Sequence, residues 1–580
     1  MHKVCVLGSG FAGLITAQVL LSDGFDVEVV SQDASPGGVW SRERVYPDLQ
    51  INNVHGEFRF SCLPMPPPKD ATVTGGRLSG EDMCAYAETF VDKFLSGRMR
   101  YKTLVTRVRR VEEGGWLLDV KDLKTGEIHE LRYTKLALCT GGCHTPSIPD
   151  YLAPEAARRA GFSGAVLHSR DLGPEFATLL QNDGHPKKFV IIGGGKSAQD
   201  AAKNFVKAGH RATMIFEKAD TVLAAPIPLP SFIRRSRQLS VFHAYIVSDV
   251  VHRRFLHTTR VGAAIVHGTF STINALSVSA ALGIPSDSPL RNAHSMFWDI
   301  RLNDEGTARD GSFFALANAG KIDLVAPARA SGYAPGGSGV ILEDGRTLAA
   351  DVVILATGYT SSWGGILGAF LRLDLCIHLL KSAEDDVREE LGLNRRLQVE
   401  DDAEFDHLWN EYTSLANPPR AAREAHMVAS IYRGLVPAAN LGRRDFAING
   451  AIFTTNSGYT FEVGAHWISS YFLRDAFLKL PPTPEDALTH ARMTAAWLRR
   501  RHPRMLGWAN ESYSSGLAFW NWPQLTDELL ADMGLRTHRS GGSWLTWPFA
   551  VIDLSEIATL GEERRVQRAL LRDRRSSRVL

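Results

Sequence analysis

Two stretches of the chain share one pattern of apolar and glycine positions. Residues 4–7 are apolar, a Gly-x-Gly-x-x-Gly motif occupies 8–13, and apolar residues then recur at helical spacing over 14–21. This order predicts a buried strand, a tight turn and a helix whose N-terminus can hold a pyrophosphate. The pattern returns at 189–198, where an apolar run precedes Gly-Gly-Gly-Lys-Ser-Ala. The repeated pattern therefore predicts an α/β protein with two Rossmann-like dinucleotide-binding units.

The glycines of each motif have separate tasks. In the first, Gly8 permits the turn, Gly10 lets the backbone approach a phosphate, and Gly13 packs the helix on the strand. We therefore expect the first dinucleotide to contact Gly8, Gly10, Phe11, Ala12 and Gly13. The corresponding contacts of the second are Gly193, Gly195, Lys196, Ser197 and Ala198.

The end of the second strand of the first unit lacks the usual acid. A dinucleotide fold places an acidic side chain there to hold the ribose hydroxyls, and Ser31 occupies that position after the strand 26–30. A serine hydroxyl binds a ribose more weakly than a carboxylate does. Gln32 or Asp33 is expected to share the task.

A polar run follows at 46–61, with Asn52, Asn53 and Val54 at its centre. Such a run is either a solvated loop or the lining of a polar cofactor ring. Beyond it, short alternating strands at 101–112 and 116–120 predict a small antiparallel excursion from the parallel sheet. Further residues expected beside the first cofactor are Gly38, Val39, Trp40, Val105, Thr140 and Gly141.

The second unit leaves the choice of nicotinamide cofactor open. Its second strand ends in Glu217-Lys218, and a carboxylate favours NAD whereas a cation favours the 2′-phosphate of NADP. The apolar strand at 351–355 then ends in Ala356-Thr357-Gly358-Tyr359, much as the strand at 135–138 ends in Thr-Gly-Gly. Two such endings predict returns of the chain to the first sheet, on either side of an inserted domain.

Composition narrows the class of protein. The 580 residues are 44% hydrophobic and 22% charged, as in soluble globular proteins, and the net charge of +2 gives no reason to expect nucleic acid as a partner. Six cysteines without regular spacing and a first strand near residue 3 predict a cytoplasmic protein. Cys139 and Cys143 are expected to be packing thiols rather than a redox disulfide, and no metal site can be completed.

Two later stretches bear on membrane contact. Residues 261–286 carry no Asp, Glu, Lys or Arg, which fits a buried or cofactor-lining helix, a helix on a membrane surface, or a membrane span. We expect the first of these, without a transmembrane span, and leave peripheral contact open. The arginine-rich tail at 564–578 is expected to be a solvated basic terminus.

With these motifs in hand, the chain resembles the flavin-containing monooxygenases, class B flavoproteins related to the Baeyer–Villiger monooxygenases. The resemblance is carried by the two glycine motifs, by 37–40, by Phe162-x-Gly164-x-x-x-His168 and by 356–359. It implies FAD in the first unit and NADPH in the second, with Lys218 on the NADPH side. It also implies an FAD domain formed by 1–150 and 340–475, an inserted NADPH domain at 160–335, and a mixed C-terminal extension at 476–580. Thr357, Gly358 and Tyr359 then join the cofactor contacts.

The resemblance further implies the reaction. FAD reduced by NADPH would transfer one oxygen atom from O2, through a C4a-(hydro)peroxyflavin held by Asn52 or its neighbour Asn53, to a small lipophilic substrate. N- or S-oxygenation is favoured over Baeyer–Villiger oxygenation of a ketone. A flavin-dependent dehydrogenase, a disulfide reductase and a non-catalytic FAD-binding protein are alternatives from other classes. The oligomeric state is not predicted.

Overall fold

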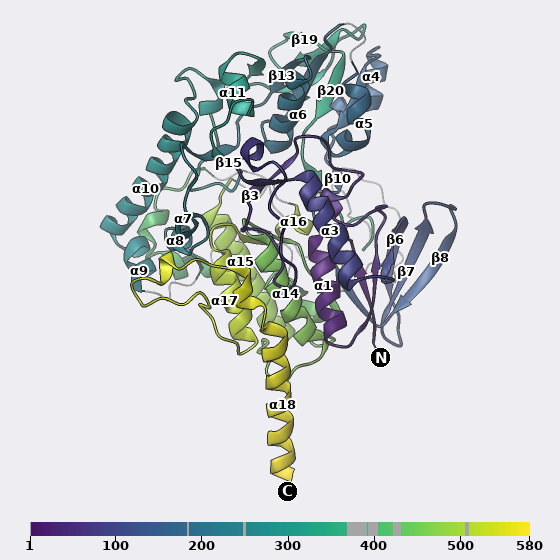
Figure 1. Ribbon diagram of the computed structural model, residues 1–580, viewed down its shortest axis with the longest axis vertical. Helices are drawn as coiled ribbons and strands as arrows, with labels where there is room; N and C mark the ends of the chain where they lie inside the picture. Colours follow the sequence, from purple (N-terminus) through teal and green to yellow (C-terminus); the bar gives the residue numbers. More distant parts are fainter. Residues whose placement is uncertain are drawn as a thin grey trace.

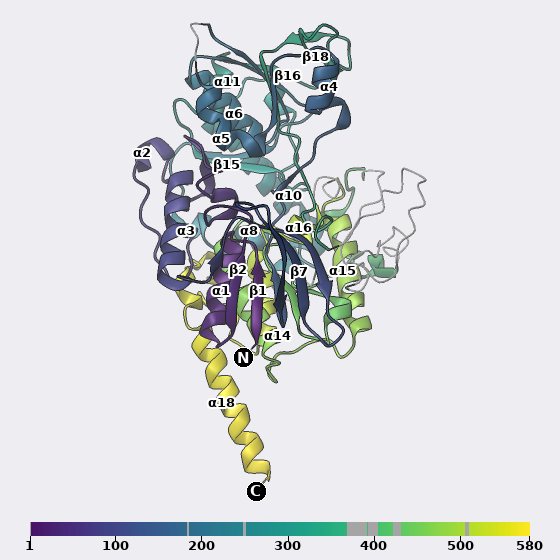
Figure 2. The same cartoon turned by 90° about the vertical axis from the view of Figure 1, so that its right-hand side faces the viewer.

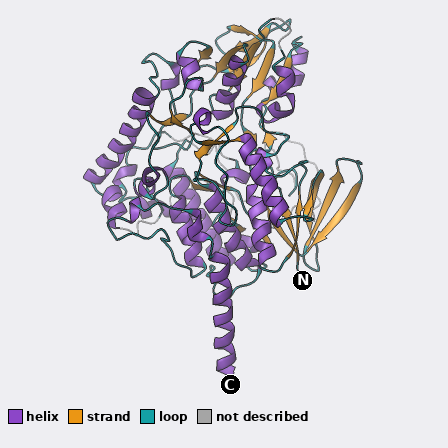
Figure 3. Ribbon diagram, viewed as in Figure 1, coloured by secondary structure: helices purple, strands orange, loops and turns teal. Residues whose placement is uncertain are grey.

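A computed structural model describes residues 2–181, 185–246, 251–367, 391, 404–420, 431–504 and 510–579. The molecule has two lobes, and the long helix α18 projects from the lobe that holds the N-terminus (Figures 1 and 2). Each lobe contains a parallel sheet and a smaller antiparallel sheet, with helices around them (Figure 3). This arrangement confirms the predicted α/β class.

The first sheet is parallel and lies in the lobe with the N-terminus. Its strands are short and almost entirely buried, because helices and a second small sheet cover its two faces. The order is β24 (Phe446–Ile448), β9 (Lys135–Leu138), β1 (Lys3–Leu7), β2 (Asp26–Val30) and β5 (Met99–Arg100). The helices α1 (Phe11–Ser22), α3 (Gly80–Phe94) and α14 (Ser457–Phe472) share its main core.

An antiparallel sheet interrupts this lobe, as the alternating pattern predicts. It consists of β6 (Thr103–Arg110), β7 (Trp116–Asp122) and β8 (Ile128–Tyr133). Its inward side chains form a separate core with β1 and β9, in which Trp116 is fully buried.

The second sheet lies in the other lobe and is also parallel. Its order is β11 (Ala165–His168), β20 (Val352–Leu355), β12 (Lys188–Ile192), β13 (Arg211–Ile215) and β16 (Ile322–Val325). The helices α5 (Leu172–Leu179), α6 (Lys196–Lys207) and α11 (Phe313–Asn318) share the core of this lobe. A three-stranded antiparallel sheet joins this lobe, with β17 (Ala330–Tyr333), β18 (Gly339–Leu342) and β19 (Thr347–Ala349).

One expected return to the first sheet is wrong. The strand before Ala356 is β20, and it pairs with β11 and β12 of the second sheet. The fifth strand of the first sheet is instead β24, which pairs with β9 about ninety residues later. A run of four buried apolar residues suits the middle of either parallel sheet, so its sequence does not specify the sheet it joins.

The charge-free stretch forms one long helix beside the second lobe. Helix α10 (Arg260–Ala275) continues as a π-helical segment at Leu276–Ala281. By length and composition alone, the 22-residue helix Arg260–Ala281 could cross a membrane. One of its faces packs on β14 (Thr221–Ala225), which pairs with β15 (Leu302–Thr307), and the opposite face is exposed.

The C-terminal extension packs into the first lobe. Strand β26 (Gly516–Ala518) pairs with β25 (Ile452–Thr454), and α17 (Trp522–Asp532) packs on α14. Helices α15 (Pro484–Arg501) and α16 (Glu511–Ser514) precede them. The extension therefore shares a core with the first unit.

The final helix carries a buried arginine near its start. In α18 (Leu560–Val579), Arg564 is fully buried, and its Nη1 lies 2.7 Å from Asp23 Oδ2. The expected solvated tail is therefore wrong at Arg564, because a carboxylate beyond the end of α1 supplies its partner.

The described residues also form shorter α-helices and strands. They are β3 (Gln50–Val54), α2 (Ala71–Thr74), β4 (Arg77–Ser79), β10 (Thr145–Pro146), α4 (Pro154–Arg159), α7 (Ser231–Arg234), α8 (Gln238–Val241), α9 (Val251–Thr258), β21 (Tyr359–Thr360), β22 (Ile431–Tyr432) and β23 (Val436–Pro437).

Candidate active site

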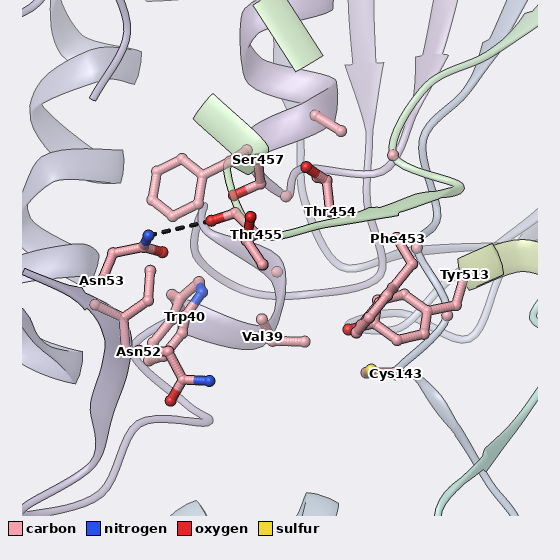
Figure 4. Close-up of a pocket in the computed structure, with 18 of the residues that line it drawn as sticks. Val39, Trp40, Asn52, Asn53, Cys143, Phe453, Thr454, Thr455, Ser457 and Tyr513 are labelled. Carbon is pink, nitrogen blue, oxygen red and sulfur yellow. Dashed lines mark hydrogen bonds between the residues drawn. The ribbon is translucent and has the colours of Figure 1, made fainter. Parts of the chain in front are cut away.

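A cavity of about 1330 Å³ lies between the two lobes. Its walls come from the turn after β1, the strand β3, the start of α6, the helix α10 and the C-terminal extension. Figure 4 shows part of this lining. A pocket for one small ligand typically measures about 300–1,000 Å³. The cavity therefore has room for a cofactor together with a second molecule.

The first glycine turn is shaped to accept a phosphate. A Cβ on Gly8 would lie 2.4 Å from the Cys139 carbonyl oxygen, and one on Gly13 would lie 1.9 Å from the Gly8 carbonyl oxygen. Neither position tolerates a side chain. At Gly10, by contrast, the nearest atom to such a Cβ is 3.8 Å away, and Gly10 lines the cavity directly before α1. The N-terminus of α1 thus meets the cavity with exposed backbone, as an anion site requires.

The position expected to hold a ribose has a buried hydroxyl group. Ser31 Oγ accepts hydrogen bonds from the Ser9 hydroxyl, at 2.8 Å, and from the Asp33 backbone N–H, at 3.2 Å. Its own proton therefore remains to be donated. Asp33 lies at the cavity too, and its carboxylate pairs with Arg44 at 2.7 Å. Burial raises the pKa of the Asp33 carboxyl in spite of Arg44.

Gln32 has a neutral partner at the cavity wall. Its Nε2 lies 2.5 Å from Nε2 of His144. Burial lowers the pKa of His144 to about 4, so the imidazole is uncharged at neutral pH.

The two asparagines of β3 differ in what they contact. Asn53 Nδ2 donates to the Thr455 carbonyl oxygen at 3.2 Å, as Figure 4 shows, and to Glu57 at 3.4 Å. The side-chain Oδ1 of Asn52 is buried and has no hydrogen-bond partner among the described residues, and the side chain lines the cavity. A buried amide without a partner costs free energy unless a ligand satisfies it. Asn52 is therefore the side chain placed to contact a bound group.

An ion cluster joins the two lobes at the same wall. Arg234 of α7 contacts Glu57 through Nε at 2.6 Å and Asp304 of β15 through Nη2 at 2.7 Å. All three side chains are largely buried. Because Glu57 also accepts from the Val54 backbone N–H at 2.9 Å, the cluster fixes the end of β3.

Every charged side chain among the described lining residues belongs to an ion pair. Arg235 is held least closely, 3.9 Å from Asp553, and its Nη1 also donates to the Gly56 carbonyl oxygen at 2.8 Å. The remaining pairs are Asp33–Arg44, Lys196–Asp200, Glu57–Arg234 and Asp304–Arg234.

The two cysteines near the first turn are free thiols. Burial raises the pKa of both Cys139 and Cys143 to about 12, so neither is a thiolate at neutral pH. Disulfide exchange requires a thiolate. The pair therefore lacks the reactivity that a disulfide reductase needs. Within the described ranges, His, Cys, Asp and Glu form no group of three that could hold a metal ion.

The second glycine turn lies outside the cavity, but the start of the helix that follows it lines the cavity wall. Gly193 has φ of 137°, and a Cβ there would lie 2.4 Å from the Ala356 carbonyl oxygen. Lys196 and Ser197, at the start of α6, line the cavity. Beyond β13, the Glu217 carboxylate pairs with Arg329 at 2.6 Å, and the hydrogen bond from Arg329 lowers the pKa of Glu217.

The structure brings most of the predicted contacts together. The predicted residues that line the cavity are Gly8, Gly10, Phe11, Ala12, Ser31, Gln32, Gly38, Val39, Trp40, Asn52, Asn53, Val105, Thr140, Gly141, Lys196 and Ser197. Those that lie outside it are Gly13, Val54, Gly193, Gly195, Ala198, Lys218, Thr357, Gly358 and Tyr359. Thr357 instead donates to the Ser147 carbonyl oxygen at 2.5 Å, in the connection between the lobes.

Sequence reasoning missed two parts of the wall. One is the N-terminus of α14, where Thr454, Thr455 and Ser457 line the cavity (Figure 4). Asn456 caps this helix by accepting from the Tyr459 N–H at 3.2 Å, and the Asn-Ser-Gly sequence was its available signal. The other part is aromatic and comes from the C-terminal extension: Tyr513, Phe519, Trp520 and Trp522.

Known proteins share this chain's sequence pattern and fold. Residues 2–235 match the family profile of the pyridine nucleotide-disulphide oxidoreductases. An FAD-dependent monooxygenase from Alternaria brassicicola is 27% identical over 98% of this chain and 95% of its own. A probable flavin-containing monooxygenase from Arabidopsis thaliana is 27% identical over 62% of this chain and 70% of its own. These relatives support a class B flavin-dependent monooxygenase.

A solved structure shares the fold of this chain. A steroid monooxygenase bound to NADP has a TM-score of 0.58 and 17% identity, over 92% of this chain and 98% of its own. That solved protein is bound to NADP, and the relative from Alternaria brassicicola is FAD-dependent. The profile match covers residues 2–235, and within it the raised pKa values of Cys139 and Cys143 do not fit the reactive pair of a disulfide reductase.

Proposed function

We propose that this monooxygenase uses NADPH and O2 to oxygenate a nitrogen or sulfur atom of a small lipophilic molecule. The observation that carries the proposal is one continuous cavity, which reaches the first glycine turn, the unpartnered amide of Asn52 and the start of α6. An electron donor, a flavin and a substrate can therefore meet without release into water.

The lining of the first lobe fits FAD. The open backbone at Gly10 suits its pyrophosphate, the Ser31 hydroxyl suits its ribose, and the polar edge at 454–457 suits its ring. When bound, FAD accepts hydride from the nicotinamide and activates dioxygen.

The residues of the chain then have three tasks. Asn52 offers its amide as a hydrogen-bond partner at the reacting centre, while Asn53, held by Thr455, keeps the strand in place. Arg234 fixes the same strand through Glu57. The apolar lining beyond them excludes water, which would otherwise divert activated oxygen to hydrogen peroxide.

Support for NADPH over NADH comes from the end of β13. A carboxylate there would favour the free 2′-hydroxyl of NADH. Glu217 is already paired with Arg329, and Lys218 follows it directly. The local charge is therefore positive, which suits a 2′-phosphate.

Support for heteroatom oxygenation comes from the paired charges. Oxygen insertion into a ketone requires a cation that stabilises the negative charge of the attacking oxygen. Arg44, Arg234 and Arg235 of the described lining are each engaged by a carboxylate. Oxygen transfer to a neutral amine or sulfide has no such requirement.

The test uses the purified flavoenzyme with NADPH and isotopically labelled dioxygen. N,N-dimethylaniline, methyl phenyl sulfide and cyclohexanone are offered separately. We expect the N-oxide and the sulfoxide, each with one labelled oxygen atom, and faster turnover with NADPH than with NADH. Lactone as the main product would establish the Baeyer–Villiger alternative. Electron transfer to dyes without labelled product would establish a dehydrogenase.

A further inference from the structure

The C-terminal extension forms one wall of the cavity. Strand β26 pairs with β25, and this pairing places Phe519 on Phe453, with ring centroids 5.5 Å apart and planes 4° apart. Trp520 follows, in edge contact with Phe519 at 4.8 Å. Phe453, Phe519 and Trp520 all line the cavity. The extension therefore presents a stack of aromatic rings to the cavity that the first glycine turn and the start of α6 also line.

Helix α10 and its neighbouring strands form a second apolar wall of the same cavity. Phe270, Ile273 and Leu276 of the long helix line it, together with Leu223 of β14 and Met296. None of these side chains carries a charge.

Several apolar side chains of this region are buried on one side only. These side chains pack against the core cluster that joins α10 to the extension, but they remain partly exposed and line the cavity. They are Leu223, Ile273, Leu302, Phe453 and Trp520. Apolar surface left in contact with water costs roughly 25 cal/mol per Å². An apolar ligand would cover this surface and remove that cost.

The charged side chains around the cavity are already paired. The charged lining residues are ion-paired among themselves or with Asp553, so a charged ligand would find no unpaired counter-ion among the described residues. Transfer of an unpaired charge into an apolar region is strongly unfavourable. The lining thus selects against both carboxylates and amines that stay protonated.

We infer that the substrate of this monooxygenase is a neutral molecule whose apolar body binds between α10 and the aromatic segment 519–522, with its oxidisable atom directed toward Asn52. The substrate-binding chamber is thus built jointly by the inserted helix and the C-terminal extension. This inference rests on the proposed function, because it names the substrate class of the same reaction.

The test measures binding by titration calorimetry, with the FAD-loaded enzyme and no NADPH. The probes are methyl phenyl sulfides with methyl, ethyl, propyl or butyl groups in the para position, and the para-carboxylate. We expect affinity to rise about fourfold for each added methylene, the factor equivalent to about 0.8 kcal/mol per buried CH2. The carboxylate should bind at least a hundredfold more weakly than the propyl probe. Equal affinities along the series, or tight binding of the carboxylate, would overturn the inference.

Matched variants on one helix locate the chamber. Ile273 lines the cavity, whereas Ile265 lies on the same helix with 43% of its surface exposed. Ile273→Trp should weaken binding of the butyl probe at least tenfold, and Ile265→Trp should leave it within twofold. Ile273→Ala, which removes apolar contacts without adding bulk, should weaken it about fourfold or more. Equal effects at both positions would place the probe elsewhere.

The two hypotheses fail in different ways. If the sulfides bind with the expected dependence on chain length but yield no labelled sulfoxide, the proposed reaction is wrong and the chamber stands. If labelled sulfoxide forms while affinity ignores chain length, charge and Ile273, the chamber is wrong and the proposed reaction stands.

Discussion

A buried carboxyl group makes the stability of this monooxygenase depend on pH. Glu462 lies on α14 with 2% of its surface exposed. Its Oε2 accepts from the Ser61 backbone N–H at 2.8 Å, and its Oε1 accepts from the Ser61 hydroxyl. Burial raises the pKa of Glu462 to about 7, because these hydrogen bonds offset only part of the lost hydration. The folded protein therefore retains a proton that the unfolded chain releases.

The size of the effect follows from the two pKa values. An ordinary glutamate has a pKa of 4.5, against about 7 for Glu462. At about 1.4 kcal/mol for each tenfold change in proton affinity, the difference corresponds to roughly 3 kcal/mol. Since the pKa is higher in the folded state, the full stability is present below about pH 4.5. It is lost progressively as the pH rises through about 7.

The perturbation is Glu462→Gln, which keeps an acceptor for the Ser61 N–H but cannot ionise. Urea unfolding midpoints of both proteins are measured from pH 5 to pH 8. We expect the variant to gain on the wild type as the pH rises, by up to roughly 3 kcal/mol at pH 8. Glu112→Gln, at an exposed position, is the control and should show no such trend. A constant difference between Glu462→Gln and wild type at every pH would refute the reasoning.

Three further predictions concern other sites. Arg564→Ala should destabilise the protein by about 3–5 kcal/mol in the same unfolding assay, because it leaves the buried Asp23 carboxylate without its closest cation. Arg565→Ala, at an exposed position, should change the free energy of unfolding by no more than about 0.5 kcal/mol, and equal effects of the two substitutions would contradict the buried pair. Asn52→Ala should raise the amount of hydrogen peroxide formed per NADPH oxidised roughly tenfold, because the loss of one hydrogen bond to a polar centre corresponds to about a tenfold change in rate. An unchanged yield of hydrogen peroxide would show that Asn52 does not contact the reacting centre. Lys218→Ala should lower kcat/KM for NADPH roughly tenfold and leave kcat/KM for NADH unchanged. An equal decrease in kcat/KM for both cofactors would show that Lys218 does not contact the 2′-phosphate.

The local parts of the fold could be predicted from the sequence. Gly8, Gly10 and Gly13 are required by the turn itself, so their spacing predicted the strand, turn and helix that the structure contains. Alternating residues likewise predicted the antiparallel strands β6 and β7. In each case the residues that decide the conformation are neighbours in the chain.

The parts that sequence reasoning missed depend on distant partners. The strand β20 is apolar throughout, and only its pairing with β11 and β12 assigns it to the second sheet. Arg564 is buried because Asp23, more than five hundred residues earlier, supplies the opposite charge. The tryptophans of the extension were visible as a group, but nothing local connects Trp520 to a cavity between the lobes.

The chamber wall supplied by the last hundred residues has a consequence for how such enzymes can diversify. The glycine motifs that we expect to hold the nucleotides lie before residue 200, whereas Phe519 and Trp520 lie more than three hundred residues later. Sequence changes confined to the region around Phe519 and Trp520 could thus change the preferred substrate and leave the predicted nucleotide sites intact. A chimaera that carries a relative's terminal hundred residues should inherit that relative's preference.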